Sequence, residues 1–159
     1  MGGRLMDEAP HGGNLRKGRV SIPGQTYLVT AVTRGRSKVF TNFDHARTLI
    51  LTMQRSEREG RVESLAFVIM PDHLHWLFRL QAGTLAELMK QVKGRSAAGT
   101  GIPGGIWQKG YHDHALRWDE DLVRVAGYLV ANPVRAGLVR NVMDYPHWDG
   151  IWFVAENRE

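Results

Sequence analysis

The chain contains no cysteine among its 159 residues, and this absence excludes two kinds of site. Without thiols it can form neither a disulfide framework nor a thiolate-bound metal centre. No stretch approaches the roughly 18 consecutive apolar residues of a membrane span, so we expect no transmembrane helix and no membrane partner. The first residues, 1–10, lack the apolar core of a secretory signal, and we therefore expect the protein to work in the cytoplasm.

Acidic residues are in the minority: the chain has 16 of them and 21 lysines and arginines, which gives a net charge of +5. Such an excess suits a polyanionic partner, most simply nucleic acid, although many basic proteins bind none. The length fits one domain with a real core. Residues 1–18 are rich in glycine and charge without periodicity, so we expect a flexible N-terminal tail there and a single domain over 19–159.

Apolar periodicity predicts four strands and three helices. The predicted strands cover 27–33, 62–70, 73–80 and 111–117, and the predicted helices begin near 41, 84 and 119. The order β-α-β-β-α-β-α is that of the split βαβ, ferredoxin-like fold, which is of the α+β class. We therefore expect one antiparallel sheet with helices on one face, an added C-terminal helix, and strand 73–80 in the middle of the sheet.

Local signals mark the boundaries of these elements. Thr41 is followed three residues later by Asp44, a pattern that predicts the start of the first helix. Five glycines between residues 94 and 105 predict a long flexible loop. The acids of 119–121 are well placed to open the third helix, and Pro133 either ends that helix or begins a new turn.

Two histidines, His73 and His75, stand one residue apart on the third predicted strand. Alternate residues of a strand point to the same face, about 6.6–6.8 Å apart at the backbone, so both imidazoles can reach one metal ion. The pair alone is a weak signal, because it also fits a structural or solvent-facing role. A second segment, 128–139, adds to it.

Tyr128 lies on the polar side of the third predicted helix. At about 100° per residue the apolar residues gather on the opposite side of the helix. They are Leu122, Val123, Ala126, Leu129 and Val130. A tyrosine of the core would lie with them, so Tyr128 is either functional or simply exposed. Asn132 shares its face four residues on, either as the last helical residue or as the cap of a short turn through Pro133 to Gly137.

Two imidazoles, a carboxamide oxygen and a tyrosine hydroxyl together suggest phosphodiester chemistry. A divalent metal would polarise a phosphate oxygen while the tyrosine attacks phosphorus. Imidazole ligands suit Mn, Zn or Ni better than Mg, which remains a candidate because it is abundant. We therefore expect Mg or Mn as the cofactor.

Three segments carry a resemblance to a known family: 70–75 (MPDHLH), 107–117 (WQKGYHDHALR) and 128–139 (YLVANPVRAGLV). Over roughly residues 20 to 150 the chain resembles the REP-associated tyrosine transposases, a branch of the single-tyrosine HUH transposases of small insertion sequences. The resemblance implies His73 and His75 as metal ligands, Asn132 as a third polar ligand and Tyr128 as the nucleophile. It also implies the ferredoxin-like fold.

The same resemblance implies a transposase that cuts single-stranded DNA beside a hairpin. The products would be a 5′-phosphotyrosine and a free 3′-hydroxyl, with no nucleotide cofactor, and the protein would act as a monomer or a homodimer. Two other interpretations stay open. One is a metal-dependent nuclease in which water attacks, and the other is a non-catalytic module that binds hairpin DNA or RNA.

Further residues are candidates for contacts with DNA. The basic ones are Arg34, Arg36, Lys38, Lys90, Lys93, Arg95, Arg124 and Arg135, which either meet phosphates or form solvated surfaces. His112 and His114 form a second His-x-His, which either supports the site or packs structurally. Trp76 and Trp107 could stack on unpaired bases, although packing in the core is the commoner role.

Overall fold

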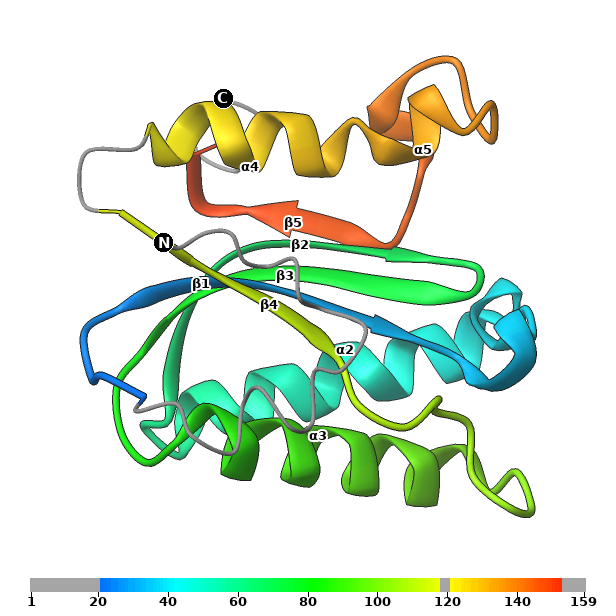
Figure 1. Ribbon diagram of the computed structural model, residues 1–159. Helices are drawn as coiled ribbons and strands as arrows, with labels where there is room; N and C mark the ends of the chain where they lie inside the picture. Colours follow the sequence, from blue (N-terminus) through cyan, green and yellow to red (C-terminus); the bar gives the residue numbers. More distant parts are fainter. Residues whose placement is uncertain (1–20, 118–120, 153–159) are drawn as a thin grey trace.

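A five-stranded antiparallel sheet forms the centre of the computed structural model, which describes residues 21–117 and 121–152 (Figure 1). The strand order is β4-β1-β3-β2-β5. The strands are β1 (Thr26–Val32), β2 (Val62–Met70), β3 (His73–Leu80), β4 (His112–Leu116) and β5 (Trp148–Gly150). The main helices are α2 (Phe43–Arg58), α3 (Leu85–Thr100), α4 (Leu122–Val130) and α5 (Asn132–Arg135).

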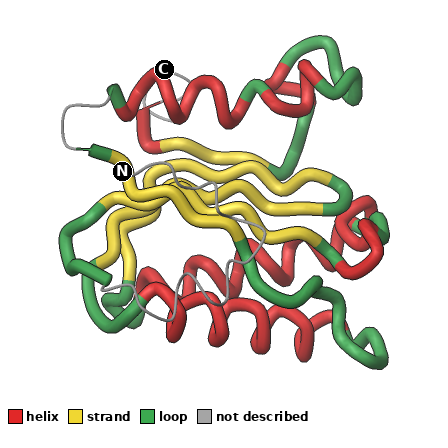
Figure 2. Tube along the Cα trace, viewed as in Figure 1, coloured by secondary structure: helices red, strands yellow, loops and turns green. Residues whose placement is uncertain are grey.

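The first four strands and the two helices between them confirm the ferredoxin-like prediction. β3 lies in the middle of the sheet, with β1 and β2 as its antiparallel neighbours. The tube in Figure 2 shows α2 and α3 together on one face, while α4 and α5 cover the other. The added C-terminal helix was expected, but the sequence pattern did not indicate that it would occupy the opposite face. The expected tail, 1–18, lies outside the described residues.

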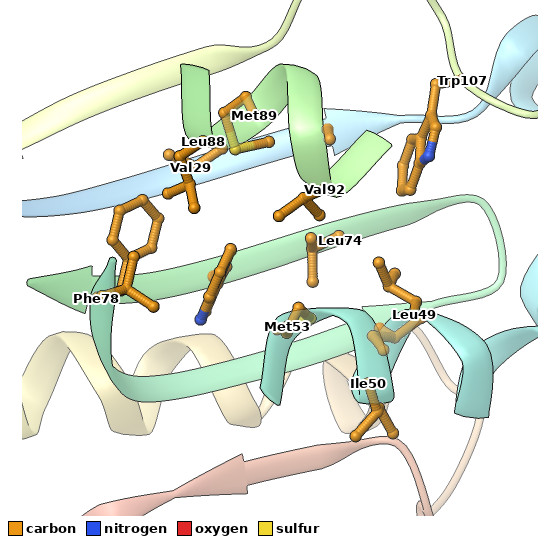
Figure 3. Close-up of a cluster of buried hydrophobic side chains, with 14 of the residues drawn as sticks. Val29, Leu49, Ile50, Met53, Leu74, Phe78, Leu88, Met89, Val92 and Trp107 are labelled. Carbon is orange, nitrogen blue, oxygen red and sulfur yellow. The ribbon is translucent and has the colours of Figure 1, made fainter. Parts of the chain in front are cut away.

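One face of the sheet packs against α2 and α3 and forms the larger core. Figure 3 shows Leu74 and Phe78 of β3 between Leu49 of α2 and Leu88 of α3. Trp76 and Trp107 belong to the same core, with 0% and 8% of their surfaces exposed. Their indole nitrogens donate to serine hydroxyls, those of the partly buried Ser64 and the buried Ser96, each at 2.9 Å. Burial keeps both rings from stacking on bases.

The other face carries a smaller core beneath α4. Alternate residues of β2 and β3 point to this side, and α4 covers them with Ala126, Leu129 and Val130. Val123, which the periodicity placed with these residues, is 46% exposed instead. The buried side of α4 instead includes Leu122 and Val125, which pack against the smaller core. The assignment of Val123 to the buried side was therefore wrong.

The predicted loop over 94–105 was also wrong in its first half, because α3 continues through it to Thr100. The buried side of the helix continues as well, since Ser96 follows Val92 at helical spacing and is fully buried. Gly99 lies where α3 meets α2: a Cβ atom there would come within 2.6 Å of a methyl carbon of Thr48. This glycine therefore allows a close helix contact rather than a break in the helix.

The starts of α2 and α4 differ from the predicted ones by small shifts, whereas α3 begins after Thr84 as predicted. Asn42, not Thr41, caps α2, since its side chain accepts a hydrogen bond from the backbone N–H of His45. Thr84 and Glu87 form the capping box of α3. Asp121 caps α4 by accepting from two backbone N–H groups. These side-chain oxygens satisfy donors that the first helical turn leaves without partners.

Strand β5 was not predicted. It pairs with β2 next to Ala66 and Val68 and extends the sheet at that edge. Tyr145, which precedes it, ties this part of the chain to the sheet: its hydroxyl donates to the carbonyl of Ile69 at 2.6 Å. Three residues that include a glycine and an aspartate give no alternation for a pattern to detect. Within the described residues, no helix is long and apolar enough to cross a membrane.

Candidate active site on the α4 face of the sheet

His73 and His75 lie on the central strand and point to the face covered by α4. Their neighbours in β3, Leu74 and Trp76, point the other way into the larger core. The two imidazole rings meet edge to face, with centroids 4.7 Å apart. The predicted pair is therefore on one face, in the most protected strand of the sheet.

The Nδ1 atom of each imidazole lies within hydrogen-bonding distance of a neighbouring side chain. The Nδ1 of His73 lies 2.7 Å from Oδ1 of Asp72, and the Nδ1 of His75 lies 2.9 Å from Oγ1 of Thr30. Thr30 stands directly opposite His75 in the pairing of β1 with β3. A ring that donates its Nδ1 proton keeps the lone pair of Nε2 for a metal ion. With both rings in this tautomer, their Nε2 atoms would be free to bind a metal ion on this face of the sheet.

Asp72 forms an ion pair with Arg36. Its second oxygen accepts a hydrogen bond from Nε of Arg36 at 3.0 Å. Partial burial works to raise the pKa of Asp72, but the hydrogen bonds and charges of His73 and Arg36 outweigh it and keep that pKa below its usual value. The carboxylate stays ionised and can only accept the proton of His73, which fixes the tautomer of that ring.

Burial makes His75 a poor base. Desolvation lowers its pKa to about 4, and the positive charges of His73 and Arg135 act in the same direction. At neutral pH the ring is therefore uncharged. A neutral imidazole is the form that binds metal ions.

Tyr128 lies on the outer side of α4 and is 69% exposed. This agrees with the predicted polar face. The guanidinium of Arg135 stands over its ring, with Cζ 3.7 Å from the ring centroid. Asn132 is the first residue of α5, and Pro133 beside it is buried. A short separate turn does follow α4, which ends at Val130, but Ala131 caps it and Asn132 is its first helical residue, so the prediction of Asn132 as the cap was wrong.

Arg135 links the two parts of the site. It contacts the Tyr128 ring, and its charge is close enough to His75 to lower the pKa of that imidazole. α4 and α5 both pack beside β2, the neighbour of the histidine strand. In residues 21–117 and 121–152, no three side chains of His, Cys, Asp or Glu form a metal cluster. The candidate donors for a metal are therefore the two imidazoles and the Asn132 amide.

The predicted basic residues fall into two groups. Some hold the fold together: Arg36 pairs with Asp72, Arg95 pairs with Glu59, and Lys93 donates to the carbonyls of Gln108 and Gly110. Others present exposed side chains to solvent. These are Arg34, Lys38, Lys90, Arg124 and Arg135. The second group provides the better candidates for contacts with a polyanion.

His112 and His114 lie on β4, which β1 separates from β3. In the register of the sheet His112 stands opposite Thr30, and Thr30 stands opposite His75. All three side chains therefore point to the same face, with Thr30 between the two histidines. His112 is thus a neighbour of the candidate metal site rather than a partner of His75.

Thr30, Asp72 and the contact of Arg135 with Tyr128 were not identified from the sequence. Asp72 had a detectable signal, since it directly precedes the first histidine. Thr30 had none, because its role depends on the register between strands that lie far apart in the chain. The contact of Arg135 depends on the path of the chain between α4 and α5.

The low pKa of His75 predicts a pH-dependent contribution to stability. In the unfolded chain this histidine takes up a proton near pH 6.5, whereas in the folded protein it does so only near pH 4. The contribution is therefore present above pH 6.5 and lost as the pH falls toward 4, by about 3 kcal/mol. Urea unfolding in EDTA should show the advantage of wild type over His75→Gln shrinking by this amount between neutral pH and pH 4. A constant difference would contradict a neutral buried His75.

Comparison with known proteins places the chain beside bacterial transposases. A family described as "Transposase IS200 like" matches residues 21–114, which include both histidines and end before Tyr128. A REP-associated tyrosine transposase of Escherichia coli (strain K12) is 28% identical over 132 residues, which are 80% of this chain and 78% of the relative. The resemblance inferred from the motifs is thus confirmed.

Solved structures agree with the fold. The structure of a REP-associated tyrosine transposase bound to a REP hairpin superposes with a TM-score of 0.75 at 27% identity, over 87% of this chain and 84% of that one. A candidate transposase from Deinococcus radiodurans R1 gives a TM-score of 0.52 at 21% identity, over 70% of this chain and 92% of that one. The second likeness concerns the fold alone.

Proposed function

Because the chain belongs to the IS200-like transposase family, we propose that it cuts and rejoins single-stranded DNA beside a hairpin, with Tyr128 as the nucleophile. One observation supports the proposal: the helices that carry Tyr128 and Arg135 cover the face of the sheet to which the histidine pair points, and Arg135 contacts the ring of Tyr128. The relative of known structure is bound to a hairpin, which supports a hairpin as the substrate.

The donor atoms fit a divalent cation with open coordination positions. His73 and His75 would hold it through their Nε2 atoms, and the amide oxygen of Asn132 is the candidate third ligand. Neutral imidazoles and an amide leave the positive charge of the ion intact for a phosphate. When bound, a metal such as Mg or Mn supplies Lewis-acid polarisation of a non-bridging phosphate oxygen.

In the chemical step the Tyr128 oxygen forms a bond to phosphorus, and the bond from phosphorus to the 3′ oxygen breaks. The tyrosine loses its proton, and the departing 3′ oxygen gains one and becomes a hydroxyl. The 5′ end stays joined to the enzyme as a phosphotyrosine, so the bond energy is conserved and no nucleotide cofactor is needed. Attack by the 3′-hydroxyl of another strand reverses the step and completes strand transfer.

The exposure of Tyr128 suits this role. A ring that is 69% exposed can be reached by a DNA strand without any movement of the core. Its helix is fixed from below by Ala126, Leu129 and Val130, which are nearly fully buried. The backbone that carries the nucleophile is therefore anchored while the side chain remains accessible.

The direct test uses labelled single-stranded DNA from beside the gene, incubated with Mn or Mg and analysed on a denaturing gel. We expect a shortened DNA with a free 3′-hydroxyl and a second species that carries the protein. Cleavage without the protein-linked species would favour the nuclease that uses water. Hairpin binding without any cleavage would favour the non-catalytic binding module.

DNA binding should depend strongly on salt. The net charge is +5, and exposed basic residues flank the site, among them Lys38 and Arg124. Neutralisation of about four phosphates would lower the affinity roughly 100-fold between about 50 and 200 mM salt. Fluorescence anisotropy with a labelled hairpin measures this slope. A salt-independent affinity would exclude an electrostatic footprint.

A matched pair of variants tests which face of the protein binds DNA. Arg124→Ala removes a positive charge from α4, and Arg58→Ala removes one from the end of α2 on the opposite face. We expect the first to reduce the salt slope by about one and the second to leave it unchanged. Equal slopes in the two variants would contradict DNA binding on the α4 face.

A further inference from the structure

Within residues 21–117 and 121–152, no carboxylate neutralises Arg135. Arg36, Arg79 and Arg95 each form an ion pair with an acidic side chain. In the part of the chain that the structure describes, no acidic group pairs with Arg135. Its recorded contact is with the face of the Tyr128 ring, which attracts the cation without using its N–H donors. The five donors of the guanidinium therefore remain available to an anion.

The local structure explains why this arginine reaches Tyr128. The two residues are seven positions apart, which in a helix places them on one face about two turns apart. Ala131 joins α4 to α5 with helical angles, φ −80° and ψ −1°, so this face is nearly continuous. Helical side chains point back toward the N-terminus, and a long arginine can therefore lie over the ring. Buried Pro133 fixes the start of α5.

We propose that Arg135 binds the scissile phosphate and, through its contact with the ring, holds Tyr128 in place for attack. The inference rests on the proposed function and adds a catalytic residue to it. As the oxygen of Tyr128 bonds to phosphorus and the 3′ oxygen leaves, charge on the non-bridging oxygens needs a donor that faces them. A guanidinium offers two parallel N–H groups to such oxygens and keeps its proton throughout.

The positions of Arg135 and the histidine pair would allow both to contact the same phosphate. The histidine pair lies on β3, and Arg135 lies on α5, which packs beside β2, the neighbour of β3. A phosphate between them would meet the metal ligands on one side and the guanidinium on the other. Tyr128, which Arg135 already contacts, would stand next to the same phosphate. The guanidinium of Arg135 would thus contact both the nucleophile, Tyr128, and the phosphate that it attacks.

The test separates the rate of the chemical step from DNA affinity. With saturating DNA and Mn, Arg135→Ala should form the covalent adduct about 100-fold more slowly than wild type, the usual effect of removing one such donor. Its Kd for the hairpin should change by less than about 3-fold, because one phosphate contact among several is lost. Arg140→Ala, which removes another exposed arginine of this segment, should leave both values unchanged.

Two further measurements exclude a merely structural effect. Arg135→Lys should recover part of the rate, because it keeps the charge but not the paired donors. Free guanidinium ion at low millimolar concentration should also raise the rate of Arg135→Ala but not that of wild type. With a methylphosphonate at the scissile position, wild type and Arg135→Ala should react at more similar rates, because the negative oxygen that Arg135 contacts is gone.

The outcomes distinguish this inference from the proposed function. If wild type forms no adduct, the proposed function fails. If wild type forms the adduct and Arg135→Ala does so equally fast at saturating DNA, only the role of Arg135 is wrong. A loss of rate that higher DNA concentration fully restores would show that Arg135 contributes binding alone, which also overturns the inference.

Discussion

Tyr128→Phe should abolish formation of the covalent protein–DNA species and leave the protein folded. Phenylalanine has no oxygen to attack phosphorus, so the rate should fall at least about 10⁴-fold, as expected for loss of a covalent nucleophile. Its ring can still lie beneath Arg135. Because the side chain is 69% exposed, the free energy of unfolding should change by no more than about 0.5 kcal/mol. Denaturing gels and urea unfolding measure the two effects.

Tyr145→Phe is the matched control for this prediction. The hydroxyl of Tyr145 donates to the carbonyl of Ile69, and burial raises its pKa to about 12, so it is a poor nucleophile. We expect this variant to keep adduct formation and to lose about 1 kcal/mol of stability. DNA cleavage by Tyr128→Phe at the wild-type rate would point to water as the attacking group. A phosphotyrosine mapped to Tyr111 or Tyr145 would keep the chemistry but reassign the nucleophile.

His73→Ala and His75→Ala should each stop DNA cleavage while largely preserving hairpin binding. The two Nε2 atoms are the main donors available to a metal, and loss of either should weaken Mn binding at least about 100-fold, more than loss of an outer partner does. Affinity for the hairpin comes mostly from basic residues and should change by less than about 3-fold. Calorimetry with Mn and anisotropy with labelled DNA test the two parts separately.

His112→Ala is the control for the histidine variants. It removes an imidazole from the same face of the sheet, on a strand that β1 separates from β3, and it leaves the Nδ1 partners Thr30 and Asp72 in the chain. We expect it to keep metal binding and to change cleavage far less. If the variant with both His73→Ala and His75→Ala still cleaved DNA at the wild-type rate, the assignment of these histidines as metal ligands would be wrong. If His112→Ala lost metal as severely as His75→Ala, a third imidazole would have to be added.

Much of the sheet could be predicted because its strands carry local signals. β2 and β3 begin and end where the alternation and the Pro71-Asp72 turn placed them. The same alternation put His73 and His75 on one face, and the helical period put Tyr128 opposite the apolar side of α4. These features depend on neighbours within a few residues, and a sequence pattern records such neighbours directly.

What could not be predicted depends on contacts between distant segments. Gly99 looks like a helix breaker until Thr48 of α2 is seen against it. Lys93 and Arg95 look like DNA contacts, yet backbone carbonyls and Glu59 hold them. Thr30 gains its role only from the register of β1 against β3. In each case tertiary structure chooses among roles that the residue type alone leaves open.

The placement of α4 has a consequence for the order of the reaction. This helix rests on the sheet of its own chain, so one polypeptide carries both the histidine pair and the tyrosine. Under the proposed mechanism, cleavage is then unimolecular within a complex of one protein and one DNA strand. We therefore expect dilution to lower the chance that protein and DNA meet without slowing cleavage within the complex; a cleavage rate at saturating DNA that falls with protein concentration would contradict this expectation.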